Sequence, residues 1–162
     1  MLLGIEVEQA LAIVMDSLSL LEAERRPILD CLSRVLAEDV AADMDIPPFT
    51  NSAMDGYAIF AADTQGATPE RPALLRVIAD LPAGYAPPER VARGEAVRIM
   101  TGAPMPDGTD AVARVEITEK IGDGVRISTP VTAGLDVRYS GEDVRKGESV
   151  LPRGTLVRAA EV

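Results

Sequence analysis

The sequence predicts an α+β fold in which a helical N-terminal stretch precedes a region of short strands and a final mixed stretch. Apolar residues recur at helical spacing near the N-terminus, whereas short apolar runs divided by glycine and proline occupy the middle of the chain. At 162 residues the chain is long enough to build one large domain or two small ones around a core. We therefore expect helices first, strands next, and a mixture after them.

Two amphipathic helices are predicted within the first 45 residues. The first has an apolar stripe with alternating spacings of four and three residues, formed by Val7, Leu11, Val14, Leu18 and Leu21. The second follows Pro27 and runs out near Glu38, and its stripe is formed by Ile28, Leu29, Leu32, Val35 and Leu36. We therefore expect residues 1–45 to be mostly helical.

Short strands and turns are predicted for the rest of the chain. The apolar runs that indicate strands are residues 77–78, 97–100, 111–117 and 125–128. We expect Asp123 and Gly124 to provide the two positive-φ residues of a tight hairpin turn. Segments 64–72 and 82–95, rich in Pro, Gly, Ala and charge, are expected to be loops. The last run, residues 159–162, is typical of a helix that begins, so we expect the chain to be part of a longer protein.

The charge and hydropathy of the chain exclude some classes of partner. Acidic residues outnumber basic ones by 26 to 16, and aromatic residues are few, which argues against nucleic acid. No apolar run approaches the roughly 20 residues needed to span a bilayer. Glu6 and Glu8 stand where a secretory leader would have Lys or Arg. We therefore expect a cytoplasmic protein without a membrane partner.

The absence of histidine and the single cysteine limit the chemistry of any site. Histidine acid–base catalysis, histidine-bound zinc, an internal disulfide and cysteine metal clusters are all excluded. Cys31 has leucine neighbours at 29 and 32, so we expect a buried structural thiol. Any bound metal must be a hard ion on oxygen ligands, and the sequence does not single out which residues hold it.

Three loops combine small residues, which let a ligand approach the backbone, with polar side chains. The first, residues 51–56, ends in Asp55-Gly56. The second, residues 98–108, places Thr101-Gly102 after a strand, where a hydroxyl and amides could receive an oxyanion. The third, residues 136–143, contains Arg138 with Glu142 and Asp143. Taken singly, these features also suit a turn, a strand end, or a solvated ion pair worth about 0–1 kcal/mol.

Together and in this order, the loops resemble the MoeA-type molybdopterin molybdenumtransferases and the related gephyrin E domain. The matching segments are Pro48–Ala58, Arg98–Pro104 with Asp107–Val112, and Val137-Arg138 with Gly141–Val144. The resemblance covers the whole chain. It implies an elongated helical or mixed domain, residues 1–45 with 141–162, interrupted by an inserted β-barrel-like domain, residues 46–140. The catalytic α/β domain and the C-terminal β domain of a full family member have no counterpart in these residues.

The resemblance also implies an activity and its residues. Such enzymes function in molybdenum cofactor biosynthesis: they insert molybdenum from molybdate into adenylylated molybdopterin, release AMP, require Mg²⁺, and form homodimers. By motif, Asp55, Thr101 and Asp143 are implied as catalytic residues. The residues implied in substrate binding are Asn51, Ser52, Gly102, Arg138 and Glu142.

Physical roles follow for these implied residues. Thr101 is suited to donate to an oxyanion, Arg138 to pair with charge, and the two aspartates to position substrate or stand near a metal. In the family the cleft is completed by the third domain, thought to come from the opposite subunit. We therefore expect this chain to hold one half of each site and to be incomplete as an enzyme on its own.

Two other interpretations stay open. A non-catalytic dimerisation and partner-binding module would present Asp55, Thr101 and Asp143 on separate surfaces, whereas a shared site requires their loops to converge. A generic sugar- or phosphate-binding β-domain is disfavoured by the acidic balance and by the lack of a phosphate-loop lysine motif.

Overall fold

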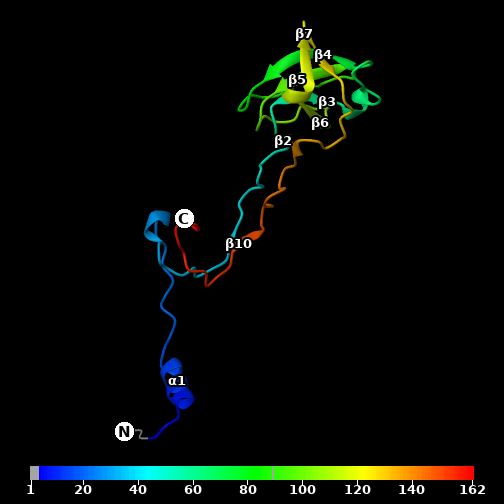
Figure 1. The fold of residues 1–162 in the computed structure, drawn as a ribbon. Coiled ribbons are helices and arrows are strands. Elements are labelled where there is room, and N and C mark those ends of the chain that lie inside the picture. The colour runs from blue at the N-terminus through cyan, green and yellow to red at the C-terminus, as the bar shows by residue number, and fades with distance from the viewer. Residues whose placement is uncertain (1–3, 89) are drawn as a thin grey trace. The chain divides into compact units, whose positions relative to one another are not determined.

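A computed structural model describes residues 4–88 and 90–162, which are divided between two compact units. Unit 1 comprises Met1–Val40 with Leu151–Val162, and unit 2 comprises Ala41–Val150 (Figure 1). Over the described residues the fold is mixed but dominated by strands, with one α-helix. No helix in these ranges is long and apolar enough to cross a membrane.

Unit 1 contains the α-helix, α1 (Val7–Asp16). The first predicted helix is therefore confirmed, although it ends before Leu18 and Leu21. Its last turn closes where the Ser17 hydroxyl donates to the Val14 carbonyl over 2.7 Å, a side-chain bond that competes with continued helix. None of the ten residues of α1 is buried, so its apolar stripe faces solvent.

The second predicted helix is wrong. A single 3₁₀ turn, Ile28–Asp30, occupies its start, and Ser33 then adopts a φ of 64°, which no right-handed helix accepts. The segment that follows is extended, because its amides pair with the end of the chain: Ser33 N donates to Val157 O over 2.8 Å, and Leu36 N donates to Thr155 O over 2.9 Å. Residues 1–45 are therefore not mostly helical, since distant pairing overrides the local 3.6-residue spacing.

Two smaller expectations in unit 1 also need correction. Cys31 is half-buried and not fully buried, and its thiol lies 3.4 Å from the Pro27 carbonyl. The expected C-terminal helix is a turn in which Glu161 N donates to Arg158 O over 3.1 Å. The Glu161 carboxylate accepts from the amide of the same arginine over 2.8 Å, which closes the turn.

Unit 2 is built on a six-stranded sheet with the order β6-β3-β5-β4-β8-β7 (Figure 1). Its strands are β3 (Gly56–Ile59), β4 (Ala73–Leu81), β5 (Glu95–Ile99), β6 (Ala111–Arg114), β7 (Thr118–Ile121) and β8 (Gly124–Ile127). Two 3₁₀ helices, η2 (Ala61–Thr64) and η3 (Val115–Ile117), follow β3 and β6. Only β4 and β5 run parallel. The strands predicted at 77–78, 97–100 and 125–128 are confirmed as parts of β4, β5 and β8. The strand predicted over 111–117 is confirmed only as far as Arg114, because residues 115–117 form η3 instead. The sheet has β6 and β7 at its edges, and the expected barrel is not confirmed.

The core of unit 2 lies on both faces of this sheet. Side chains of β3 alternate between the two faces: Tyr57 and Ile59 belong to one buried cluster, and Ala58 belongs to the other. All four residues of β3 are buried. The first residue of β3 is Gly56, and this position requires glycine because a Cβ there would lie 2.2 Å from the carbonyl oxygen of Ala113.

The hairpin between β7 and β8 is confirmed with a shift of one residue. Ile121 pairs with Gly124, so the two turn residues are Gly122 and Asp123. Gly122 alone has a positive φ, 58°, at the first central position, where a type II′ turn requires it. Gly124 belongs to β8, where its missing Cβ leaves room for the Leu75 carbonyl oxygen.

Short strands continue unit 2 beyond the sheet. They are β1 (Val40–Ala41), β2 (Asn51–Ser52), β9 (Val137–Arg138) and β10 (Ser149–Leu151), and the boundary between the units falls within β1 and β10. Between these strands the two chain segments stay hydrogen-bonded: Ile46 N donates to Val144 O over 2.8 Å, and Ala42 N donates to Glu148 O over 2.9 Å.

Candidate functional site

The three loops singled out from the sequence meet at β2. On one side, Asn51 pairs with Arg138 of β9 in an antiparallel ladder. On the other side, Gly102 N donates to Ser52 O over 2.8 Å, and Ser52 N donates to Ala103 O over 3.0 Å. The first loop therefore lies between the second and the third, joined to each by backbone hydrogen bonds.

Asp55 and Thr101 form the closest side-chain contact between the first two loops. One carboxylate oxygen of Asp55, Oδ1, accepts from the Thr101 amide over 2.8 Å and from the Thr101 hydroxyl over 2.7 Å. These two bonds, the backbone one first, hold the pKa of Asp55 below its ordinary value, and the charge of Arg98 acts in the same direction. Asp55 is exposed, so the structure presents an ionised carboxylate to solvent.

The donors of the second loop are engaged within unit 2. The Thr101 hydroxyl and amide go to Asp55, Gly102 N goes to Ser52 O, and Ala103 N donates to Met100 O over 3.0 Å. In this conformation Thr101 holds Asp55 in place, and its hydroxyl is not free to donate elsewhere. The oxyanion-donor role stays a prediction.

The third loop contains an ion pair and a carboxylate-capped turn. Arg138 contacts Asp143 through Nη2 and Oδ2, and both side chains are exposed. The hydrogen bond to Asp143 raises the pKa of Arg138 further above its ordinary value, with a smaller contribution from Glu142. Glu142 Oε2 accepts from the Tyr139 amide over 2.9 Å, so this side chain closes the turn of its own loop.

Asn51 and Ser52 have little side-chain surface to offer a ligand. Ser52 is 1% exposed, and its hydroxyl donates to the Met54 carbonyl over 2.6 Å. Asn51 is also buried, and its Nδ2 donates to the Phe49 carbonyl over 3.1 Å. Both side chains hold the first loop in shape, which fixes the course of the chain toward Asp55.

The predicted residues are therefore brought together by backbone pairing but fall into two side-chain groups. One group is Asp55 with Thr101, and the other is Arg138 with Glu142 and Asp143. Over residues 4–88 and 90–162, no hydrogen bond or ion pair joins the two groups. Within the same ranges no cluster of three or more His, Cys, Asp or Glu side chains could hold a metal ion.

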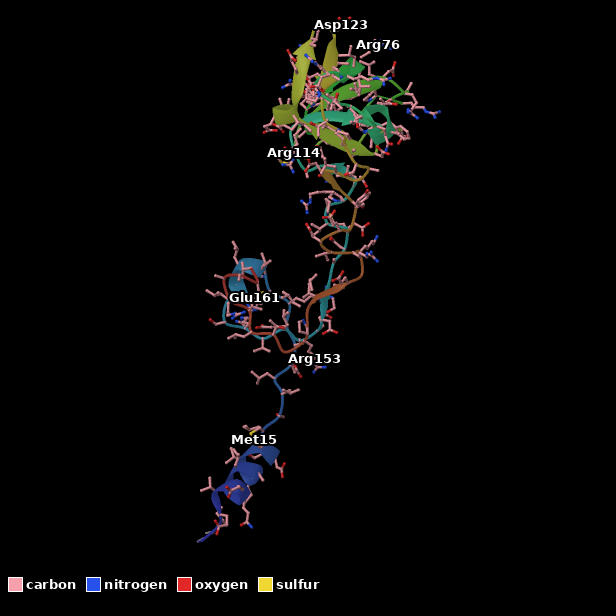
Figure 2. All side chains as sticks on the ribbon, turned by 45° about the vertical axis from the view of Figure 1, so that its right-hand side comes forward. Met15, Arg76, Arg114, Asp123, Arg153 and Glu161 are labelled. Atoms are coloured by element: carbon pink, nitrogen blue, oxygen red, sulfur yellow. The ribbon has the colours of Figure 1, made fainter. Side chains whose placement is uncertain are left out.

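Sequence reasoning missed one residue pair at this site. Arg114, at the end of β6, donates from Nε and Nη2 to the two carboxylate oxygens of Asp136 over 2.6 and 2.7 Å. Figure 2 labels Arg114 at the end of the sheet nearest β2 and β9. Asp136 opens the third loop, and its carbonyl accepts from the Ala53 amide of the first loop over 2.9 Å. A charged residue that ends an apolar strand is too common a pattern to have identified this pair.

Relatives of known name match most of the chain. A "Molybdopterin molybdenumtransferase 2" of Mycobacterium tuberculosis is 46% identical over 134 residues, which is 83% of this chain and 33% of that protein. A molybdopterin molybdenumtransferase of Staphylococcus aureus is 34% identical over 158 residues, 98% of this chain and 38% of that protein. The crystal structure of a molybdopterin biosynthesis MoeA protein from Pyrococcus horikoshii OT3 matches with a TM-score of 0.89 and 40% identity, over 95% of this chain and 41% of that one.

These relatives define the class, which is the enzymes of molybdopterin biosynthesis named molybdenumtransferases. The model of the MoeA N-terminal region (domain I and II) matches residues 5–162. The chain belongs to this family. It spans about a third of the length of the curated relatives it matches.

Proposed function

We propose that this chain forms one wall of the active-site cleft of a molybdenumtransferase, which inserts molybdenum from molybdate into adenylylated molybdopterin and releases AMP. The observation that carries the proposal is the Asp55 carboxylate. It is ionised, exposed, and fixed through one oxygen by two bonds from Thr101. A carboxylate held in this way keeps its second oxygen available for a ligand, with little reorganisation on binding.

The other implied residues would contribute to the cleft in different ways. Asp143 and Arg138 would supply a charged edge to the cleft, since both are exposed. The substrate-binding role of Asn51, Ser52 and Gly102 would be exerted through the backbone that they shape. Glu142 would contribute by closing its turn.

The Mg²⁺ ion implied by the family resemblance would fit this site only if this chain and the substrate both supplied ligands to it. Mg²⁺ is commonly bound by one or two carboxylates together with substrate phosphates and water. Asp55 has a carboxylate oxygen to which no described residue donates, and the described residues hold no cluster that would bind the ion alone. Asp55 would therefore provide one ligand, and the substrate the others.

The complete enzyme needs more than this chain. We propose the domain division in which residues 1–45 with 141–162 form the elongated domain and residues 46–140 form an inserted, barrel-like β-domain. The α/β domain that completes the cleft would come from the partner in a cytoplasmic homodimer. Support for self-association comes from α1, where Val7, Leu11 and Val14 are each more than half exposed, since exposed apolar side chains in a row suit an interface.

The proposal is tested by molybdate-dependent release of AMP from adenylylated molybdopterin in the presence of Mg²⁺. The 162-residue chain is assayed alone and after addition of the missing domains as a separate polypeptide. We expect turnover only on complementation. Turnover by the chain alone would show that it holds a complete site, and a folded dimer without activity in either assay would favour the non-catalytic module.

A matched pair of substitutions tests the role of Asp55 in the complete protein. Asp55→Asn should reduce AMP release by more than about 10-fold, because the charge next to Thr101 is lost. Asp123→Asn is the control, since Asp123 lies on the hairpin turn, away from Arg114 in Figure 2. Equal rates in the two variants would contradict the role of Asp55.

A further inference from the structure

The Arg114–Asp136 ion pair is a two-bond clamp beside the first loop. Both nitrogens of the fork donate to different carboxylate oxygens, at 2.6 and 2.7 Å. Such bidentate pairs fix orientation as well as distance. The Asp136 side chain is only 9% exposed, whereas that of Arg114 is 46% exposed, so the carboxylate end of the pair is the less exposed one.

Asp136 is held in a conformation that its neighbours must maintain. Its φ of 55° lies in the left-handed region, which costs a non-glycine residue free energy unless contacts compensate. In that conformation its carbonyl oxygen accepts from the Ala53 amide over 2.9 Å. The carboxylate and the carbonyl of Asp136 thus connect Arg114 to the beginning of the Asp55 turn.

Arg114 reaches the other end of the same turn. It lies opposite Gly56 in the β3–β6 ladder, and the amide of the next residue, Val115, donates to the Asp55 carbonyl over 3.1 Å. The close approach of the two strands at this point depends on the missing Cβ of Gly56. Residues 53–56 are therefore attached at one end to Asp136 and at the other to the strand end that bears Arg114.

We infer that the Arg114–Asp136 pair positions the Asp55 carboxylate for its contact with Thr101, by closing a ring of contacts around residues 53–56. The inference rests on the proposed function in one respect only, the catalytic role of Asp55. Arg114 and Asp136 are positioning residues in this account, because neither touches the carboxylate of Asp55. Removing the pair would let the turn shift, and the two hydrogen bonds from Thr101 would lengthen.

The pKa of Asp55 reports this positioning without any enzymatic assay. It is measured by NMR titration of the side-chain carboxyl carbon in the 162-residue chain, with Thr101→Val as the reference for loss of the hydroxyl contact. We expect Arg114→Gln and Asp136→Asn each to raise this pKa toward the ordinary aspartate value of about 3.9. Asn tolerates a positive φ. Asp136→Asn therefore removes the charge, and the backbone can still adopt the same conformation.

The two variants separate positioning from a direct effect of charge. If charge alone acted, loss of the Arg114 cation would raise the pKa of Asp55, and loss of the Asp136 anion would lower it. Positioning raises it in both. Opposite shifts, or no shift in either variant, would overturn the inference. Arg76→Gln is the control, because it removes another exposed arginine ion pair, with Glu95, from the same sheet, and it should leave the pKa of Asp55 unchanged.

The outcome is distinguishable from failure of the proposed function. If both variants raise the pKa of Asp55 while Asp55→Asn leaves AMP release intact, the clamp stands and the catalytic role fails. If neither variant moves the pKa while Asp55→Asn abolishes AMP release, the catalytic role stands and the clamp fails. A variant whose backbone amide spectrum no longer matches that of the parent chain is set aside. Asp136→Asn alone still decides, because positioning raises the pKa of Asp55 and loss of the Asp136 charge lowers it; if Arg114→Gln alone remains, an unchanged pKa overturns the inference.

Discussion

A methyl group at Gly56 should damage the fold of unit 2 more than any change on the exposed surface. An ideal Cβ at this position would lie 2.2 Å from the carbonyl oxygen of Ala113 and 2.9 Å from its carbonyl carbon. Both are backbone atoms in the neighbouring strand, so no side-chain rotation relieves the contact. Since ordinary contacts begin at 3.4 Å, strands β3 and β6 must separate locally by roughly 1 Å for Gly56→Ala to fit.

The cost of this separation is estimated from two contributions. Overpacking in a close-packed interior costs about 1–3 kcal/mol. Loss or lengthening of the Val115-to-Asp55 backbone bond and its neighbour in the ladder adds about 0.5–1.5 kcal/mol for each. We therefore expect the free energy of unfolding to fall by about 3 kcal/mol for Gly56→Ala, which at about 2–4 °C per kcal/mol for a chain of this size lowers the Tm by about 6–12 °C.

Urea unfolding followed by circular dichroism measures the change. Gly66→Ala is the matched control: Gly66 has a φ of 74° but nothing within 4 Å of an added Cβ, so it reports the cost of backbone strain alone, about 1–2 kcal/mol. Gly56 has no such strain, and its cost is purely steric. A Gly56→Ala chain that unfolds within about 0.5 kcal/mol of the parent would refute the close approach of β3 and β6.

Two further predictions concern buried and titrating groups. Thr64→Val should cost about 1–3 kcal/mol, because the fully buried hydroxyl accepts from the Val131 amide and donates to the Ala61 carbonyl, both over 2.8 Å; Thr64→Ser, which keeps the hydroxyl, should cost less in the same urea experiment. Because the folded pKa of Asp55 is depressed, the stability that its charge provides is present above the unfolded pKa and lost as pH falls through the folded one. The difference in unfolding free energy between the parent chain and Asp55→Asn should therefore be constant near neutral pH and shrink below about pH 3.9, and a difference that grows on acidification would contradict the pKa direction.

Four strands of the sheet, β4, β5, β6 and β8, were predictable because each contains a local apolar run. The interior strand β3 was not predicted, and the run at 111–117 continued past the end of β6. The predicted hairpin turn was one residue too far along the chain, because the prediction relied on the Asp-Gly dipeptide and not on the glycine that precedes it. Gly122 is the residue that actually takes the positive φ.

The errors in unit 1 have a different physical origin. Residues 32–36 have helical spacing, yet the Ser33 and Leu36 amides bond to carbonyls at 157 and 155, which lie more than 100 positions away. No local pattern encodes a pairing at that distance, and Ser33 has no glycine-like signal for its positive φ. Periodicity therefore misidentifies a segment whose backbone partners come from the other end of the chain.

The candidate site was also predicted only in part. The motif order indicated which loops matter, and the backbone pairing of β2 with both other loops is what makes them neighbours. The family resemblance implied that Asp55 and Thr101 belong to one site, but the hydrogen bonds between these residues, 46 positions apart, were not predicted. The Arg114–Asp136 pair was missed, because a bidentate contact between a strand end and a loop start depends on how the sheet closes against the loop.

The side chains of the two-residue strand β2 lie at the centre of the site, but they are not its reactive groups, because the strand is paired on both sides. A strand paired on both sides must use its amides and carbonyls in hydrogen bonds, and its side chains here are buried and bonded to the neighbouring backbone. The exposed polar side chains of the site therefore lie outside β2, at Asp55, Thr101, Arg138, Glu142 and Asp143. Asp55 lies three residues after Ser52 of β2, so its position depends on the turn that follows that strand. A clamp such as Arg114–Asp136, which holds this turn at both ends, is the kind of contact on which the position of Asp55 depends.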